Sequence, residues 1–211
     1  MNIVSFAFNP FMENTYILYD DTSECVIIDA GCLTISERQK LQQLIEKKSL
    51  TLKRVINTHL HLDHVFGNGF LFRTYGIAPE AHMADEFLLA QLAAQSAIFG
   101  VPFHEDPQPI GKRISENETI SFGHTQLRAI HVPGHSPGSL CFYNKKDSVL
   151  FVGDVLFRGS IGRTDLPKGN YEELITGIQK KLLILPDETV VYPGHGDPTT
   201  IGREKTENPY L

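Results

Sequence analysis

The segment that most constrains this chain is 58–64, THLHLDH, which follows directly on a predicted strand. In extended backbone the side chains of His59 and His61 point to the same side, so both can bind one ion. Asp63 and His64 begin the next predicted helix and are better placed to bind a second ion. The spacing therefore predicts a metal site at the end of a strand.

Three further candidate ligands lie in loops that follow apolar segments. His135 lies in the turn 133–138, PGHSPG, and His195 lies in a similar glycine-flanked turn. Asp154 ends the apolar run VLFVGD, where a cation is the natural partner for a carboxylate. Together these positions give seven candidate metal ligands: His59, His61, Asp63, His64, His135, Asp154 and His195.

The apolar pattern predicts two similar halves, each with strands followed by a helix. A capping box at Thr34–Glu37 predicts a helix to about residue 48. We expect strands at 3–8, 15–19, 25–29, 54–58, 118–122, 125–132, 139–143, 148–152 and 189–192, a helix at 171–183 and a short C-terminal tail. The halves lack a convincing linker, which predicts one mixed α/β domain over 1–211, with helices covering the sheets.

The most apolar predicted helix spans 84–99. Its pattern favours a helix that is buried or packed in an interface, and the alternative is a lid over a pocket. A proline-containing loop at 100–112 follows it. The oligomeric state stays open, although this helix leaves room for a dimer.

Composition limits the partners of the chain. The formal net charge is −6, and the 19 lysines and arginines do not cluster, which argues against nucleic acid. No apolar run reaches the roughly 18 residues of a membrane span, and the N-terminus does not resemble a signal peptide. We therefore expect a cytoplasmic protein with no membrane partner. Three cysteines without CxxC spacing are expected to stay reduced.

With these motifs the chain resembles the metallo-β-lactamase fold superfamily, on its hydroxyacylglutathione hydrolase (glyoxalase II-like) side. The resemblance extends from the first strands to the glycine-flanked His195. It implies a four-layer αββα sandwich with the site at the edge between two sheets. It also implies two divalent ions, with these ligands: His59, His61 and His135 for the first, Asp63, His64 and His195 for the second, and Asp154 as the bridge.

Such a site suits hydrolysis of a thioester. Two divalent ions lower the pKa of a bridging water toward about 7, and a thiolate, with a pKa near about 8.5, leaves without a proton donor. We expect Asp63 and Asp154 to be catalytic and the substrate to be a small S-2-hydroxyacylglutathione-type thioester, such as S-lactoylglutathione. The ions are expected to be zinc, with iron or manganese as alternatives.

Three alternatives stay open at this point. One is a mononuclear iron persulfide dioxygenase of the same superfamily, which would use His59, His135 and Asp154. Another is a hydrolase of a different ester or a lactone, and the third is a member without catalytic activity. Full-length glyoxalase II enzymes have a helical C-terminal extension that forms much of the glutathione pocket, whereas this sequence continues for 16 residues after His195. The resemblance therefore covers the chemistry but not glutathione recognition.

Several other residues have two interpretations. Arg158 or Arg163 can hold a substrate carboxylate, and Arg163 can instead pair with Asp165. Tyr192 either lines the pocket or ends a strand. Asp29 either forms a turn or accepts a hydrogen bond from a ligand histidine. We expect ordinary structural or surface roles for the remaining residues of interest: Cys32, His82, His104, His124 and His131.

Overall fold

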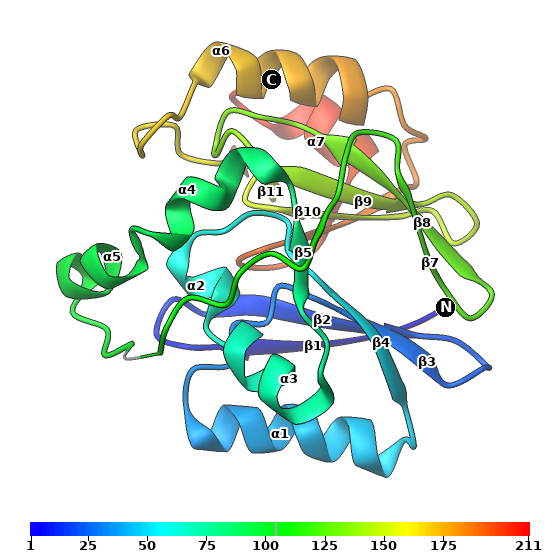
Figure 1. Cartoon of the computed structure of the whole chain (residues 1–211). Helices are drawn as coiled ribbons and strands as arrows, with labels where there is room; N and C mark the ends of the chain where they lie inside the picture. The colour runs from blue at the N-terminus through cyan, green and yellow to red at the C-terminus, as the bar shows by residue number, and fades with distance from the viewer. Residues whose placement is uncertain (104) are drawn as a thin grey trace.

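The computed structural model describes residues 1–103 and 105–211, and two six-stranded sheets form its centre (Figure 1). The first sheet has the order β1-β2-β3-β4-β5-β6, with strands β1 (Asn2–Phe8), β2 (Glu13–Tyr19), β3 (Glu24–Ile28), β4 (Thr51–Ile56), β5 (Pro79–Ala81) and β6 (Lys112–Arg113). The second has the order β14-β13-β10-β9-β8-β7, with strands β7 (Thr119–Phe122), β8 (Thr125–His131), β9 (Leu140–Asn144), β10 (Val149–Gly153), β13 (Val190–Pro193) and β14 (Thr199–Thr200). A small hairpin, β11 (Leu156–Phe157) and β12 (Ser160–Ile161), follows β10.

Helices cover the outer face of each sheet, which gives the expected four-layer αββα sandwich (Figure 1). Helices α1 (Ile35–Lys47) and α3 (Asn68–Tyr75) cover the first sheet. The second sheet is covered by α6 (Tyr171–Gly177), which continues as a π-helical turn (Ile178–Leu182), and by α7 (Ile201–Glu207). The remaining helical segments lie toward the site: α2 (Leu62–Val65), a 3₁₀ turn (Met83–Asp85), α4 (Glu86–Leu89) and α5 (Leu92–Phe99).

The side chains of strand β3 are buried on both faces of the sheet, which explains its uninterrupted apolar sequence. Val26 and Ile28 pack between the two sheets, whereas Cys25 and Ile27 pack under α1. Successive side chains of a strand point to opposite faces, so a strand in a sheet covered on both sides needs an uninterrupted apolar run.

The start of α1 confirms the predicted capping box. The Thr34 hydroxyl accepts from the backbone N–H of Glu37 at 3.2 Å, and the Glu37 carboxylate accepts from the backbone N–H of Thr34 at 2.8 Å. The same carboxylate accepts from the backbone N–H of Asn9, which joins the helix to the loop after β1. The cap therefore also fixes the position of that loop.

Two helical predictions need correction. The continuous helix expected at 84–99 is broken at Ala90 and Gln91 into α4 and α5, and α5 buries only Leu92 rather than a whole face. The C-terminal tail contains α7, which is capped by Thr200 and packs Ile201 in the core. No helix of the described residues is long and apolar enough to span a membrane.

Candidate metal centre

All seven candidate ligands lie at one edge of the sandwich. Strands β3 and β4 are parallel, as are β10 and β13, and β8 runs in the same direction as β10 because both are antiparallel to β9. The carboxyl ends of these strands therefore meet at a common edge of each sheet, where loops carry functional residues. The ligands follow four of these strands: His59, His61, Asp63 and His64 after β4, His135 after β8, Asp154 after β10 and His195 after β13.

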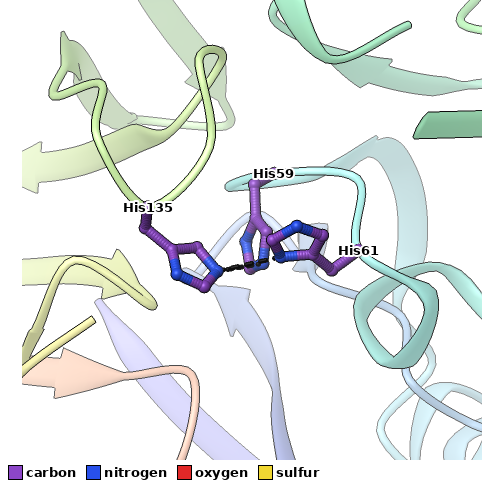
Figure 2. Close-up of side chains that lie close together, drawn as sticks. All are labelled: His59, His61 and His135. Atoms are coloured by element: carbon purple, nitrogen blue, oxygen red, sulfur yellow. Dashed lines mark hydrogen bonds between the residues drawn. The ribbon is translucent and has the colours of Figure 1, made fainter. Parts of the chain in front are cut away.

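Three buried imidazoles form the first group (Figure 2). His135 Nε2 lies 2.9 Å from His61 Nδ1 and 3.3 Å from His59 Nε2. Nitrogens that bind one tetrahedral zinc ion at 2.0–2.1 Å lie roughly 3.3 Å apart. Burial, together with the neighbouring imidazoles, lowers the pKa of His61 to about 3 and that of His59 well below its usual range. His59 and His61 are therefore neutral, and the converging nitrogens of the three rings fit a cation.

The second group combines Asp63, His64 and His195. His195 Nε2 lies 3.2 Å from Asp63 Oδ2, and His64 Nε2 lies 3.7 Å from the same oxygen. Burial opposes protonation of His64, but the carboxylates of Asp63, Asp154 and Asp29 outweigh it and hold the pKa well above its usual range. This group is therefore richer in negative charge than the first.

Asp154 lies between the two groups. Its Oδ2 is 3.7 Å from His135 Nε2 and 3.6 Å from His195 Nε2, and its Oδ1 is 3.5 Å from His64 Nε2. Both Asp154 Oδ1 and His64 Nε2 are buried and have no hydrogen-bond partner among the described residues. A buried carboxylate oxygen and a buried ring nitrogen without partners are costly, and a shared cation that replaces the proton on His64 would satisfy both.

Two glycines make room for this carboxylate. Gly153 has a φ of +51°, a left-handed conformation that turns the chain sharply before Asp154. A side chain at Gly194 would collide with Asp154 Oδ1, so the loop after β13 approaches the carboxylate by its backbone. The glycines that border Asp154 and His195 in sequence are therefore structural requirements of the site.

Acceptors around the site fix which nitrogen of each histidine faces it. His135 Nδ1 lies 2.9 Å from the carbonyl oxygen of Arg163, and His195 Nδ1 lies 3.0 Å from the carbonyl oxygen of Phe11. A carbonyl oxygen only accepts, so each Nδ1 carries a proton and Nε2 is the ring nitrogen that faces the site. Sequence analysis missed both contacts, because any residue can supply a backbone carbonyl.

Asp29 combines both roles expected for it. It has a φ of +51° at the turn after β3, and its Oδ2 lies 3.0 Å from His64 Nδ1. Thr58 donates to it from both the backbone N–H at 2.7 Å and the hydroxyl at 2.6 Å. The Thr58 hydroxyl oxygen lies 3.0 Å from His59 Nδ1 and accepts a hydrogen bond from it. Asp29 therefore orients His64 of the second group directly and His59 of the first group through Thr58.

Asp85 is a further buried carboxylate near the site, and sequence analysis did not identify it. Its Oδ1 accepts from the backbone N–H of Gly138 at 2.6 Å, and its Oδ2 accepts from the Ser136 hydroxyl at 2.7 Å and the backbone N–H of Leu60 at 3.3 Å. It therefore connects the loop of His59 to the loop of His135. The signal available in the sequence was an acidic residue in the most apolar helical segment.

Glu13 is also fully buried beside the site and was missed. It groups with Asp29 and His64, and its Oε2 accepts from the Thr15 hydroxyl at 2.9 Å. Burial raises its pKa well above the usual range. Glu13 is the first residue of β2, and the sequence did not indicate that it is buried, because strand alternation does not identify which polar residue is buried.

A cavity of about 600 Å³ opens beside the ligands and is lined by residues that include His61, His135, Asp154 and His195. Arg163 also lines it, but its guanidinium pairs with Asp165 through bonds of 2.6 and 2.7 Å. A larger cavity, of about 770 Å³, lies beside Met1 and Asp147 and contains none of the candidate ligands.

Arg158 and Tyr192, the other two expected substrate contacts, are not among the residues that line the ligand cavity. Arg158 lies 3.5 Å from Asp197. The Tyr192 ring stacks on Phe151 with centroids 5.2 Å apart, so it belongs to the core between the sheets.

The remaining described histidines and the three cysteines lie outside the metal groups. The His82 and His131 rings stack with centroids 4.1 Å apart, and His124 is exposed. His104 lies outside the described residues. The three cysteines are free and buried, and burial raises the pKa of Cys32 to about 12, which makes its thiol unreactive.

The fold and the His/Asp cluster define a metal-binding member of the αββα class, and comparison with known proteins identifies its family. The chain belongs to the metallo-beta-lactamase superfamily, whose profile matches residues 8–195, and it is a metallo-hydrolase of that superfamily. It is 39% identical over 212 residues to hydroxyacylglutathione hydrolase GloC of Haemophilus influenzae, covering 100% of this chain and 98% of that protein.

Two solved structures are similar over the whole chain. The BLEG-1 B3 metallo-beta-lactamase is 34% identical with a TM-score of 0.89, over 100% of this chain and 99% of that one. TTHA1623 in a di-iron-bound form is 34% identical with a TM-score of 0.87, over 100% of both chains.

Proposed function

We propose that this protein is a binuclear metal-dependent hydrolase of S-2-hydroxyacylglutathione-type thioesters, such as S-lactoylglutathione. The observation that carries the proposal is the pair of three-residue ligand groups, with Asp154 between them, beside a cavity. The similarity to a hydroxyacylglutathione hydrolase supports the substrate class. We propose zinc as the metal, with iron or manganese as alternatives, and the di-iron form of a similar protein supports keeping iron in the test.

The residues of this chain prepare the site in three ways. The imidazoles of the first group, the residues of the second group and Asp154 between them would hold two divalent ions, which when bound would supply a nucleophilic water at neutral pH and polarise the substrate carbonyl. Asp29 and the carbonyls of Phe11 and Arg163 keep the ligand nitrogens pointed inward. A thiolate leaves without a proton donor, so a thioester requires no further acid from the cavity.

The persulfide dioxygenase is the second candidate, because one iron can use residues of the same site. His135 Nε2 lies 3.3 Å from His59 Nε2 and 3.7 Å from Asp154 Oδ2, so these three ligands already face one another. This function leaves the other four candidate ligands, His61, Asp63, His64 and His195, without a metal. The number of ions per chain and the need for oxygen therefore separate the two candidates.

The test combines metal content per chain with anaerobic turnover of S-lactoylglutathione. We expect about two ions per chain and thiol release without oxygen. His59→Ala should remove a metal ligand and abolish turnover, whereas His124→Ala changes an exposed histidine and serves as the matched control. About one iron per chain, no thioester cleavage and oxygen uptake with glutathione persulfide would instead establish the dioxygenase.

A further inference from the structure

The cavity beside the metal ligands has an apolar wall that the proposed chemistry does not require. We infer that this wall selects thioesters carrying an uncharged, apolar organic group, which packs against α5 while the scissile carbonyl lies at the ligands. The inference rests on the proposed function and names the substrate feature that this site recognises. The wall consists of Phe11, Leu62, Ala94, Ile98, Phe99, Leu166 and Pro167.

Exposure of the wall points to an apolar occupant. Ile98 is 79% exposed and Phe99 is 47% exposed, although both line the cavity. Apolar surface gains about 25 cal/mol per Å² when it is removed from water. A substrate group that covers Ile98 and Phe99 gains this free energy, whereas a charged group at the same place loses hydration.

Contacts with the ligand loops hold α5 at this place. The Gln95 side-chain oxygen accepts from the backbone N–H of Leu62 at 3.3 Å, in the first turn of the helix that carries Asp63. The Phe99 ring packs edge-on against Phe11, with centroids 5.5 Å apart. The carbonyl of Phe11 accepts from His195, so the wall and the metal ligands share these supports.

Charge in the cavity argues against recognition of a glutathione carboxylate. Among the described residues that line the cavity, Arg163 is the single lysine or arginine, and its guanidinium already pairs with Asp165. Selection among thioesters therefore comes from the apolar wall.

The experiment measures kcat/KM for two thioester series. In one series the acyl group of a glutathione thioester lengthens from acetyl to butanoyl to hexanoyl. In the other, S-lactoyl thioesters have thiols of increasing apolar size, from N-acetylcysteamine to benzyl mercaptan. In the series whose apolar group meets the wall, kcat/KM should rise up to about fourfold per buried methylene. The responding series shows whether the acyl or the thiol group occupies the wall.

Ile98→Asp places a charge on the wall and should bring the ratio of kcat/KM between the longest and shortest substrates toward one. Ile184→Asp is the matched control, because Ile184 is 73% exposed and does not line the cavity, and it should keep the wild-type ratio. Circular dichroism of both variants checks that the fold is intact. Phe99→Ala shortens the wall without adding charge and should lower the ratio in the same direction.

The outcomes separate the two proposals. Hydrolysis of S-lactoylglutathione with no dependence on apolar size in either series overturns the apolar selection and leaves the hydrolase in place. An equal effect of Ile98→Asp and Ile184→Asp also overturns the selection. Failure to hydrolyse any thioester with two ions bound overturns the proposed function and this inference with it. A wild-type dimer that Ile98→Asp dissociates would assign the wall to an interface instead.

Discussion

Single residues outside the metal groups decide how the histidines of the site are presented. The carbonyls of Phe11 and Arg163 accept from His195 and His135, and Asp29 accepts from His64. Each contact directs one ring N–H away from the site, so the other ring nitrogen faces the candidate ligands. Metal affinity at this site therefore depends on acceptors that do not themselves touch the metal.

The first prediction concerns Asp154, the carboxylate between the two groups. Asp154→Ala should lose the second ion and reduce hydrolysis by more than about 100-fold, since changing an outer partner of a ligand already costs roughly 10- to 100-fold. Metal content per chain and kcat/KM for S-lactoylglutathione measure both effects.

The fold of the Asp154→Ala variant should persist, because its carboxylate lies at the site rather than in an apolar cluster. Asp21→Ala, at an exposed aspartate, controls for a general effect of removing a carboxylate. Full turnover by Asp154→Ala would reject the role of Asp154 as the shared ligand.

The second prediction concerns Arg163. Its guanidinium is 58% exposed and pairs with Asp165, whereas its contribution to the site is a backbone carbonyl that any residue retains. Arg163→Ala should leave KM for S-lactoylglutathione within about twofold, because an exposed ion pair contributes little. Steady-state kinetics decide this, and a tenfold higher KM would show that the guanidinium binds substrate.

At the scale of elements, the helical segment 83–99, which follows β5, holds the loops of the site together. Asp85, in the 3₁₀ turn, binds the loops of His59 and His135, and Gln95, in α5, binds the start of α2. The helical segment is broken between these two residues, and Gln91 N–H bonds to the Leu88 carbonyl at the break. The break lets α4 and α5 adopt separate directions while each keeps its contact with a ligand loop.

The third prediction tests Asp85. Asp85→Ala leaves the backbone N–H groups of Leu60 and Gly138 without their acceptor, which should lower the free energy of unfolding by roughly 2–3 kcal/mol. It should also weaken metal binding, because the loops of both histidines lose a common support. Urea unfolding and metal titration measure these effects.

The matched comparison for Asp85→Ala is Asp85→Asn. It keeps the size of the side chain but only one acceptor oxygen, so its losses should be smaller. Unchanged stability and metal affinity in Asp85→Ala would show that the loops hold their places independently.

At the scale of the whole molecule, the two sheets also contact each other through turns that carry none of the candidate metal ligands. Asp20, in the turn after β2, accepts from the backbone N–H of His124 at 2.7 Å and from the Thr125 hydroxyl at 2.9 Å. His124 and Thr125 belong to the turn and strand that follow β7 in the second sheet. Burial raises the pKa of Asp20, but hydrogen bonds from Thr22, Thr125 and His124 outweigh it and lower the pKa to about 2.

The fourth prediction follows from this pKa. A depressed pKa in the folded state means that ionised Asp20 stabilises the fold above the unfolded pKa of about 3.9. This contribution is lost as the pH falls toward about 2. The free energy of unfolding of wild type should therefore exceed that of Asp20→Asn at neutral pH, and the difference should shrink between about pH 4 and about pH 2.

Urea unfolding of both proteins across this pH range measures the difference. Asp21→Asn, at the exposed neighbour, should show no such trend. A difference between wild type and Asp20→Asn that stays constant with pH would contradict the assignment.

Local sequence patterns were sufficient for much of the fold. The capping box at Thr34 predicted the start of α1, and apolar runs predicted the long strands of both sheets, because capping and strand alternation act between near neighbours. Short elements such as β5 and β6 were missed, since two or three residues give no period. The break in 84–99 was missed because it depends on contacts with distant loops. A single domain over 1–211 stays a prediction.

The sequence by itself determined which residues can bind metal, because His59, His61, Asp63 and His64 have ligand chemistry in one short segment. Only the tertiary structure decided which side chains surround them. It brought Asp29, Asp85 and Glu13 to the site, packed Tyr192 against the core and placed the exposed face of α5 beside the ligands. The reason is physical: ligand chemistry is a property of each residue, whereas orientation and cavity lining depend on contacts between segments distant in sequence.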